Sequence, residues 1–243
     1  MMPNGYTSAQ RRFILREAEL FEFEDVRRFY EENQDPLVAE RPSEVIRAAL
    51  HDGSIIIAID TQEDDDRKRI FGASAAYTRV VNLPTGGRAV LKEAGSSLIK
   101  KSHRGYGLHK VFHWLRSLHE HILDKGGFEE YFSAVRAPNP ISERSLIRTG
   151  FEPWESAPPH LMELKQSALP DDSDATIEIF RLPLEALQTH AKELLAFELE
   201  HVASKNGNGD TDAVEVYLAV QILERYRPVV QAIADLGPKL GLA

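Results

Sequence analysis

A glycine-rich turn, Arg104-Gly105-Tyr106-Gly107, separates an alternating, strand-like run from a segment with helical periodicity. Two glycines with one residue between them allow the backbone to turn tightly and bring several N–H groups close to one ligand. The helix is predicted to begin at Leu108, so the positive end of its dipole points at the same place. Together these features favour a phosphate-binding turn, and His109 directly after it is placed to contact phosphate as well.

Two familiar phosphate motifs do not fit this turn. The dinucleotide-binding motif needs a third glycine, where this chain has Lys110, and an acidic residue roughly 20 positions further on at the end of a second strand. A Walker loop would end in Gly-Lys-Ser/Thr, which is absent. From the two glycines alone, the alternative of a plain strand-to-helix turn stays open.

The segments after the turn have clear signals for their beginnings and ends. A helix is predicted as far as Lys125 because its apolar residues recur at helical spacing. A strand over residues 130–135 follows, and then a short helix in which Asn139 suits the N-cap, Pro140 the first turn and Gly150 the left-handed end. The apolar face of the first helix is formed by Leu108, Val111, Phe112, Leu115, Leu118 and Ile122.

This order of strand, phosphate turn, helix, strand, short helix and Gly-Phe resembles the GNAT superfamily of N-acetyltransferases. The family's pyrophosphate loop, Gln/Arg-x-x-Gly-x-Gly/Ala, falls on residues 102–107, and its second signature falls on Asn139 and Gly150-Phe151. The resemblance runs from a first strand near residues 13–15 to a closing strand at residues 160–164. It implies an α/β (α+β) fold with a mixed, mostly antiparallel sheet that is flanked by helices and splayed at the acyl-CoA site.

The resemblance also implies acetyl-CoA as acyl donor and an amine-bearing acceptor. Backbone groups around Ile99 are expected to lack a strand partner where the sheet splays, and to bind the pantetheine arm and the developing oxyanion. The expected coenzyme contacts are Leu98, Ile99, Lys101, Arg104, Gly105, Tyr106, Gly107, Leu108, His109, Asn139 and Ser142.

Glu93 is the expected general base. It lies six residues before Ile99, and members of the family often have a glutamate at this place that acts directly or through water. The other interpretation is a strand-end carboxylate that lies in solvent or pairs with Lys92 or Arg88. Because strand side chains alternate, we expect that of Glu93 to share a face with Gly95, Ser97 and Ile99.

Two positions depart from the family's pattern. Ser102 stands where Gln or Arg is usual, which removes a side-chain contact to pyrophosphate and keeps the backbone cradle. Leu146 stands where many members have the tyrosine that protonates the leaving thiolate. Two functions therefore remain open: an N-acyltransferase that works by direct attack in a ternary complex, and a non-catalytic acyl-CoA-binding regulatory module. Other candidates for the acid are Tyr106, Tyr77, Ser145 and His160.

Metal chemistry is not expected. His109 and His113 are four residues apart, and His119 and His121 follow on the same helix. They lie off the apolar stripe without a carboxylate at matching spacing, so we expect an exposed polar helix face and no metal. The charged run at residues 60–69 is expected to be a solvated hairpin loop.

Length and composition limit the possible domain organisation, site chemistry and partners. The 243 residues, 42% of them hydrophobic, suit one catalytic domain, residues 1–167, with an extension, residues 168–243. The absence of cysteine excludes disulfides, thiolate metal sites and an acyl-cysteine intermediate. A formal net charge of −9 argues against a nucleic-acid partner. Without an apolar run of about 20 residues or a signal pattern at the start, we expect no membrane association and a cytoplasmic location.

The extension is expected to contain a linker, a short strand and a helical hairpin. Residues 170–174 are polar, and residues 176–180 alternate like a strand. Two amphipathic stretches follow, at residues 184–202 and 214–233. Two helices alone bury little, so we expect them to pack on the main domain, on a second copy as a homodimer, or over the acceptor site as a lid.

The N-terminal segments alternate between strands and helices. Strands are predicted at residues 12–17, 55–59 and 70–80, and helices at residues 23–33 and 43–51. The uninterrupted apolar run at residues 55–59 is typical of a strand in the middle of a sheet.

Overall fold

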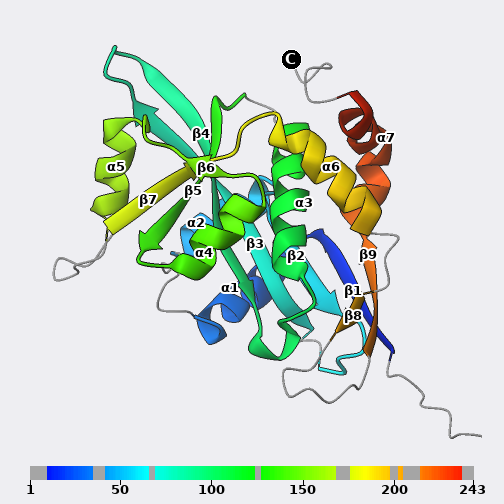
Figure 1. Cartoon of the computed structure of the whole chain (residues 1–243). Helices are drawn as coiled ribbons and strands as arrows, with labels where there is room; N and C mark the ends of the chain where they lie inside the picture. The colour runs from blue at the N-terminus through cyan, green and yellow to red at the C-terminus, as the bar shows by residue number, and fades with distance from the viewer. Residues whose placement is uncertain are drawn as a thin grey trace, which may run out of the picture.

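One mixed sheet runs through the whole described part of the chain. The computed structural model describes residues 10–34, 42–65, 69–123, 127–167, 176–197, 202–204 and 214–236. The strand order is β6-β7-β5-β4-β3-β2-β1-β9-β8 (Figure 1). The strands are β1 (Gln10–Glu17), β2 (Ile55–Asp60), β3 (Ile70–Asn82), β4 (Arg88–Ile99), β5 (Glu130–Ala137), β6 (Glu152–Pro153), β7 (Thr176–Arg181), β8 (Val202–Ser204) and β9 (Val214–Val220).

Most neighbouring strands in this sheet are antiparallel. Strands β1 to β4 form a continuous antiparallel meander in the spatial order β4-β3-β2-β1. Parallel pairing occurs between β4 and β5 and between β1 and β9. The mixed, mostly antiparallel sheet predicted from the sequence is confirmed, as is the central, doubly buried position of β2.

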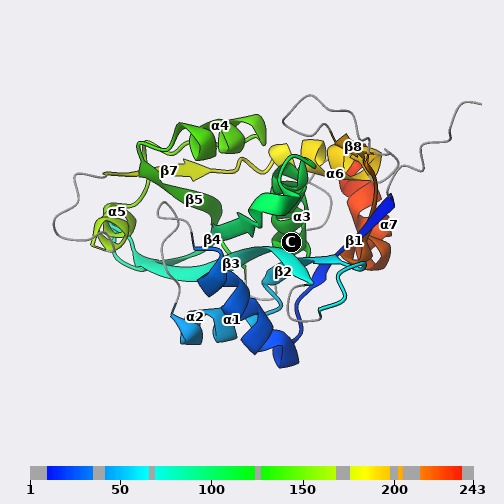
Figure 2. The same cartoon turned by 90° about the horizontal axis from the view of Figure 1, so that it is seen from below.

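Helices cover both faces of the sheet (Figure 2). One side, which we call the α1 face, is covered by α1 (Phe23–Glu32), α2 (Ser43–His51) and, near β7, α5 (Pro159–Gln166). The other side, the α3 face, is covered by α3 (Leu108–Leu123), α4 (Pro140–Arg148), α6 (Ala186–Phe197) and α7 (Gln221–Leu236). The α3 face has one apolar core and the α1 face has two, one under α1 and α2 and one under α5, so the buried strand side chains are divided between the two faces.

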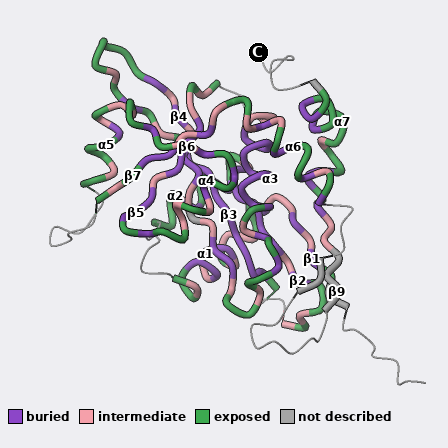
Figure 3. The backbone as a smooth tube through the Cα atoms, viewed as in Figure 1, coloured by how far each residue is buried: buried purple, intermediate pink, exposed green. Residues whose placement is uncertain are grey.

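Helix α3 is buried along almost its whole length (Figure 3). Residues 111–120 are all buried, including His113 at 5% exposure and His119 at 1%. The exposed polar face expected for this helix is therefore wrong, because α6 and α7 pack against the side turned away from the sheet. His119 has its partner on β1, where Glu17 Oε1 lies 2.7 Å from His119 Nε2.

The C-terminal segment is part of the sheet, which corrects the expected helical hairpin. Residues 214–220 form strand β9, which pairs parallel to β1, and the second helix, α7, begins only at Gln221. The sequence Val-Glu-Val-Tyr-Leu-Ala-Val is rich in β-branched residues and alternates, which suits a strand. Helices α6 and α7 do pack together, with Gln188 Nε2 donating to Ala234 O at 3.1 Å, and their apolar sides lie on α3.

The closing strand expected at residues 160–164 is a helix. Pro159 occupies the first position of α5, which suits its fixed φ, and Leu161 is buried while Met162 and Leu164 are exposed. The position next to β5 is taken instead by β7, which was expected as a short strand. The predicted linker at residues 170–174 lies outside the described residues. So do residues 66–68 of the predicted charged loop.

None of the helices in the described ranges is long and apolar enough to cross a lipid bilayer.

Candidate active site at the split between β4 and β5

Strands β4 and β5 separate in the middle of the sheet. Their parallel pairing runs from Leu91 and Glu130 to Ala94 and Ser133, although β4 continues to Ile99 and β5 to Ala137. Over residues 95–99, the β5-facing edge of β4 is therefore paired neither with β5 nor with any other strand of the described ranges. Such an edge presents backbone donors and acceptors to a ligand, as the predicted splay requires.

A bulge in β4 lies at the start of this split. Ala75 on β3 is opposite Gly95, whereas Ala73 is opposite Leu98, so β4 has one extra residue between these pairs. A bulge of this kind reverses the alternation of side chains beyond it. Leu98 consequently faces the α1 face and Ile99 the α3 face. The expectation that Glu93 shares a face with Ser97 and Ile99 is wrong for this reason.

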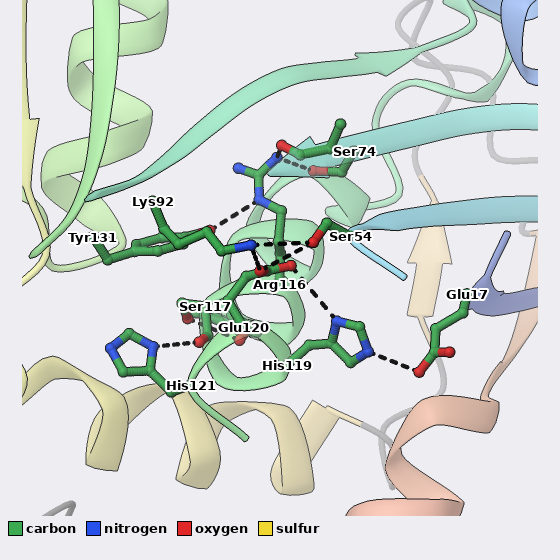
Figure 4. Close-up of polar contacts among 12 residues, drawn as sticks. Glu17, Ser54, Ser74, Lys92, Arg116, Ser117, His119, Glu120, His121 and Tyr131 are labelled. Carbon is green, nitrogen blue, oxygen red and sulfur yellow. Dashed lines mark hydrogen bonds and ion pairs between the residues drawn. The ribbon is translucent and has the colours of Figure 1, made fainter. Parts of the chain in front are cut away.

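Arg116 of α3 reaches the bulge from the α3 face, and Figure 4 shows its contacts with Ser74 and Tyr131. Its side chain is 1% exposed, and Nη1 donates to Ala75 O at 2.6 Å and to Gly95 O at 2.9 Å. The same nitrogen contacts the hydroxyls of Ser74 and Ser97, which lie 2.7 Å from one another. Nε donates to the Tyr131 hydroxyl at 3.0 Å, and burial raises the pKa of Tyr131 to about 12. One guanidinium thus joins β3, β4 and β5 where β4 and β5 separate.

The glycine turn lies directly after the free end of β4. Gly105 and Gly107 have φ values of 95° and 72°, and a Cβ at Gly105 would meet nothing within 4 Å. Tyr106 points away from this open side into the core, where its ring packs edge-on against Phe13 at 5.5 Å. His103 anchors the other end of the turn by stacking on Phe71 at 4.3 Å. The side chains fix the turn, and the glycine backbone is left accessible, as a phosphate cradle needs.

Helix α4 borders the same site from the β5 side. Asn139 caps it as predicted, with Oδ1 accepting from Ser142 N at 3.2 Å. His109 Nδ1 lies 3.1 Å from Ser145 Oγ, which connects the beginning of α3 to α4. Desolvation lowers the pKa of His109 to about 4, so its ring is neutral near pH 7. Leu146, at the position of the expected acid, is buried in the α3-face core.

The remaining expected coenzyme residues differ in exposure. Leu98, Ile99 and Leu108 have buried side chains, so a ligand could contact them mainly through their backbone. Lys101 and Arg104 are exposed, and Arg104 Nε donates to Ile99 O at 3.1 Å, at the last residue of β4. These two cations therefore lie beside the open glycine turn.

Glu93 lies on the α1 face, one residue before the end of the β4–β5 pairing. Its side chain is 2% exposed, which excludes the alternative of a carboxylate in solvent. Oε2 is 2.6 Å from Arg79 Nε, and Oε1 contacts Lys165 Nζ. Lys92, an expected partner, is on the opposite face and pairs with Glu120 (Nζ to Oε2, 3.0 Å).

Sequence reasoning missed three charged residues of this site. Arg79 follows Tyr77 by two positions on β3 and so shares its face, a signal that the alternating pattern contained. Lys165 directly follows residues 160–164, which were assigned to a strand although they belong to helix α5. Arg116 lies on a helix whose polar positions were expected in solvent, so nothing local indicated a buried guanidinium.

No metal site is evident in the described ranges, where no three His, Cys, Asp or Glu side chains gather in a way that could hold an ion.

Similarity to known proteins is visible in structure and not in sequence. No family model matches the chain, and no curated protein matches it. Among solved structures, a chain of the NatC complex bound to Gag peptide and CoA superposes with a TM-score of 0.52 at 13% identity, covering 71% of this chain and 99% of that one. Arabidopsis thaliana NAA60 in complex with acetyl-CoA gives a TM-score of 0.50 at 14% identity, with 70% and 97% covered. With its split sheet, glycine turn and capped short helix, the chain has the fold of the GNAT N-acetyltransferases.

Proposed function

We propose that this chain is an acyl-CoA-dependent N-acyltransferase that transfers an acetyl group from acetyl-CoA to a primary amine by direct attack in a ternary complex. The observation that carries the proposal is the end of the β4–β5 pairing after Ala94 and Ser133, directly beside the glycine turn. An extended acyl-pantetheine arm needs an unpaired strand edge, and its diphosphate needs a nearby anion cradle. This fold brings the two together.

In the proposed complex, the phosphates lie on residues 104–109 and the pantetheine arm lies along residues 98–101. The α4 cap at Asn139 and Ser142 borders the arm from the other side. The exposed cations Lys101 and Arg104 would offset the negative charge of the diphosphate. The bulge next to Gly95 provides backbone N–H groups for the thioester oxygen as negative charge develops on it.

Glu93 is the proposed base for the attacking amine. Its position on the α1 face, one residue before the split, is within the region that an acceptor must reach. Both carboxylate oxygens already contact cations, Arg79 and Lys165, so an incoming amine has to replace one of them or act through a water molecule. Arg79 lies on the sheet and Lys165 on a peripheral helix, which makes Lys165 the partner more easily displaced.

The second candidate function is a non-catalytic acyl-CoA-binding regulatory module. It is favoured by one observation, the burial of Leu146 in the core at the place where a tyrosine would protonate the thiolate. Thiolate is a good leaving group and can take its proton from water, so an enzyme without this tyrosine can still catalyse the transfer.

The test is amine-dependent release of coenzyme A, measured with a thiol reagent. The chain contains no cysteine and gives no thiol background. We expect release across part of a broad panel of amines and peptide N-termini, rising with pH because the neutral amine is the nucleophile. Glu93→Gln should slow release by about a hundredfold or more and leave acetyl-CoA affinity nearly unchanged.

Glu120→Gln is the matched control, since Glu120 is also a buried glutamate paired with a lysine but lies on the α3 face. It should keep the rate of thiol release. If acetyl-CoA binds and no acceptor in the panel gives release above the hydrolysis rate, the binding module replaces the enzyme. If Glu120→Gln and Glu93→Gln lose activity equally, Glu93 is not the base.

A further inference from the structure

Lys165 occupies the position in which an acceptor amine would be expected. It extends from α5, and its Nζ contacts Oε1 of Glu93. The same Nζ lies 5.9 Å from the ring centroid of Phe132, the residue opposite Glu93 on β5. Its side chain is 12% exposed, so the ammonium is largely withdrawn from water.

This position is close to the proposed site of the thioester. Glu93 and Phe132 form the third of the four β4–β5 pairs, and the split begins after the next pair. Successive residues in a strand advance by about 3.3 Å. Glu93, which the amine contacts, therefore lies two residues, or about 7 Å along β4, from Gly95 at the near side of the bulge. A primary amine, the proposed base and the free strand edge therefore meet at one place in the same chain.

We propose, resting on the proposed function, that Lys165 is an acceptor built into the chain and is acetylated by its own active site. The Lys165 ammonium gives a proton to Glu93, and the neutral Nζ attacks the carbonyl carbon of the acetyl thioester. An N–C bond forms and the C–S bond breaks. Of the two protons lost by nitrogen, one neutralises the departing thiolate and the other reaches solvent. The products are Nε-acetyllysine, coenzyme A and one proton.

The modification changes what Glu93 contacts. Acetylation turns the ammonium into a neutral amide that no longer forms an ion pair, and Arg79 remains on Oε2. Oε1 then loses its ion pair with Lys165. Self-acetylation thus acts as a first turnover that removes the Lys165 cation from the base before an external amine is used.

The experiment is incubation of the purified full chain with acetyl-CoA in the absence of any acceptor, followed by intact mass and peptide mapping. We expect a gain of one acetyl group per chain, located at Lys165, with a first-order rate that does not depend on protein concentration. Lys165→Arg should abolish the gain. Lys92→Arg is the matched control, because Lys92 is 15% exposed and also bound to a buried glutamate, but on the opposite face. It should acquire the acetyl group as wild type does.

A second readout is the time course of thiol release with an amine acceptor. Wild type should show a lag that disappears after preincubation with acetyl-CoA, and Lys165→Gln, which resembles acetyllysine, should show none. Acetylation that is equal at Lys92, persists in Glu93→Gln, or rises in rate with protein concentration would overturn the proposal. If amines are acetylated and Lys165 is not, this inference alone fails. If acetyl-CoA neither binds nor releases thiol with any amine, the proposed function fails and this inference fails with it.

Discussion

Replacing Arg116 by leucine should destabilise the protein far more than replacing an exposed arginine such as Arg144. Leucine fills part of the same buried space but donates no hydrogen bond to Ala75 O or Gly95 O, which accept from Nη1 at 2.6 and 2.9 Å. The Ser74 and Ser97 hydroxyls retain each other as partners at 2.7 Å. The loss therefore falls mainly on the two carbonyls at the bulge.

The expected cost follows from these two contacts. A hydrogen bond to a charged group contributes about 1.5–3 kcal/mol to stability, so losing two should lower the free energy of unfolding by about 3–6 kcal/mol. Natural domains have about 5–15 kcal/mol in total, so the variant should still fold and be markedly less stable. For a chain of this size, about 2–4 °C per kcal/mol gives a decrease in Tm of roughly 6–24 °C.

Urea unfolding and thermal scans at fixed protein concentration measure this cost, with Arg144→Leu as control. Arg144 is exposed on α4, with one contact from Nε to Pro140 O, and its replacement should change stability by less than about 0.5 kcal/mol. Tyr131→Phe removes only the acceptor of Nε and should cost about 1 kcal/mol. A loss below about 1 kcal/mol in Arg116→Leu would refute the reasoning, because the two carbonyls would then have found other donors.

Two further predictions test the turn and the buried histidines. Acetyl-CoA at about 100 times its Kd should stabilise the wild type by roughly 2.7 kcal/mol and so raise its Tm. Gly105→Val or Gly107→Val should abolish this thermal shift. The control Gly86→Val, in an exposed turn with φ of 79°, should keep it. An unchanged shift in both turn variants would mean that the cofactor binds elsewhere. Burial holds the pKa of His113 well below its usual 6.5, and neighbouring positive charges add to this. The unfolded chain therefore binds a proton that the folded chain does not as pH falls below about 6.5, and stability is lost in that direction. His113→Phe should reduce the loss of unfolding free energy between pH 7 and pH 5 by about 1–2 kcal/mol in urea titrations; equal losses in both proteins would contradict this assignment.

The parts of the fold that could be predicted have local signals in the sequence. Helix α4 was placed correctly because Asn139, Pro140 and Gly150 mark its cap, first turn and end. The glycine turn was found because positive φ at two nearby positions requires residues of that type. These signals depend on residues a few positions apart, so a single sequence contains them in full.

The parts that were wrong depend on tertiary partners. Residues 214–222 repeat apolar side chains at a helical interval as well as in alternation, and only the free edge of β1 selects the strand. The bulge between Gly95 and Leu98 has no local signature, so Ser97 and Ile99 were assigned to the wrong face. Arg116 was missed because a polar helix position normally indicates solvent, and here two further helices cover it.

The long separation in sequence between β1 and its partner β9 affects how the protein folds during synthesis. Strand β1 begins at Gln10, and its parallel partner opposite that residue is Glu215 in β9. During synthesis, this edge of β1 stays unpaired until residues 214–220 have left the ribosome, and pairing between such distant segments is slow. An unpaired strand edge is a template for association with other chains. Shortened versions that end before residue 214 should therefore accumulate as aggregates, even though they contain every residue of the candidate site.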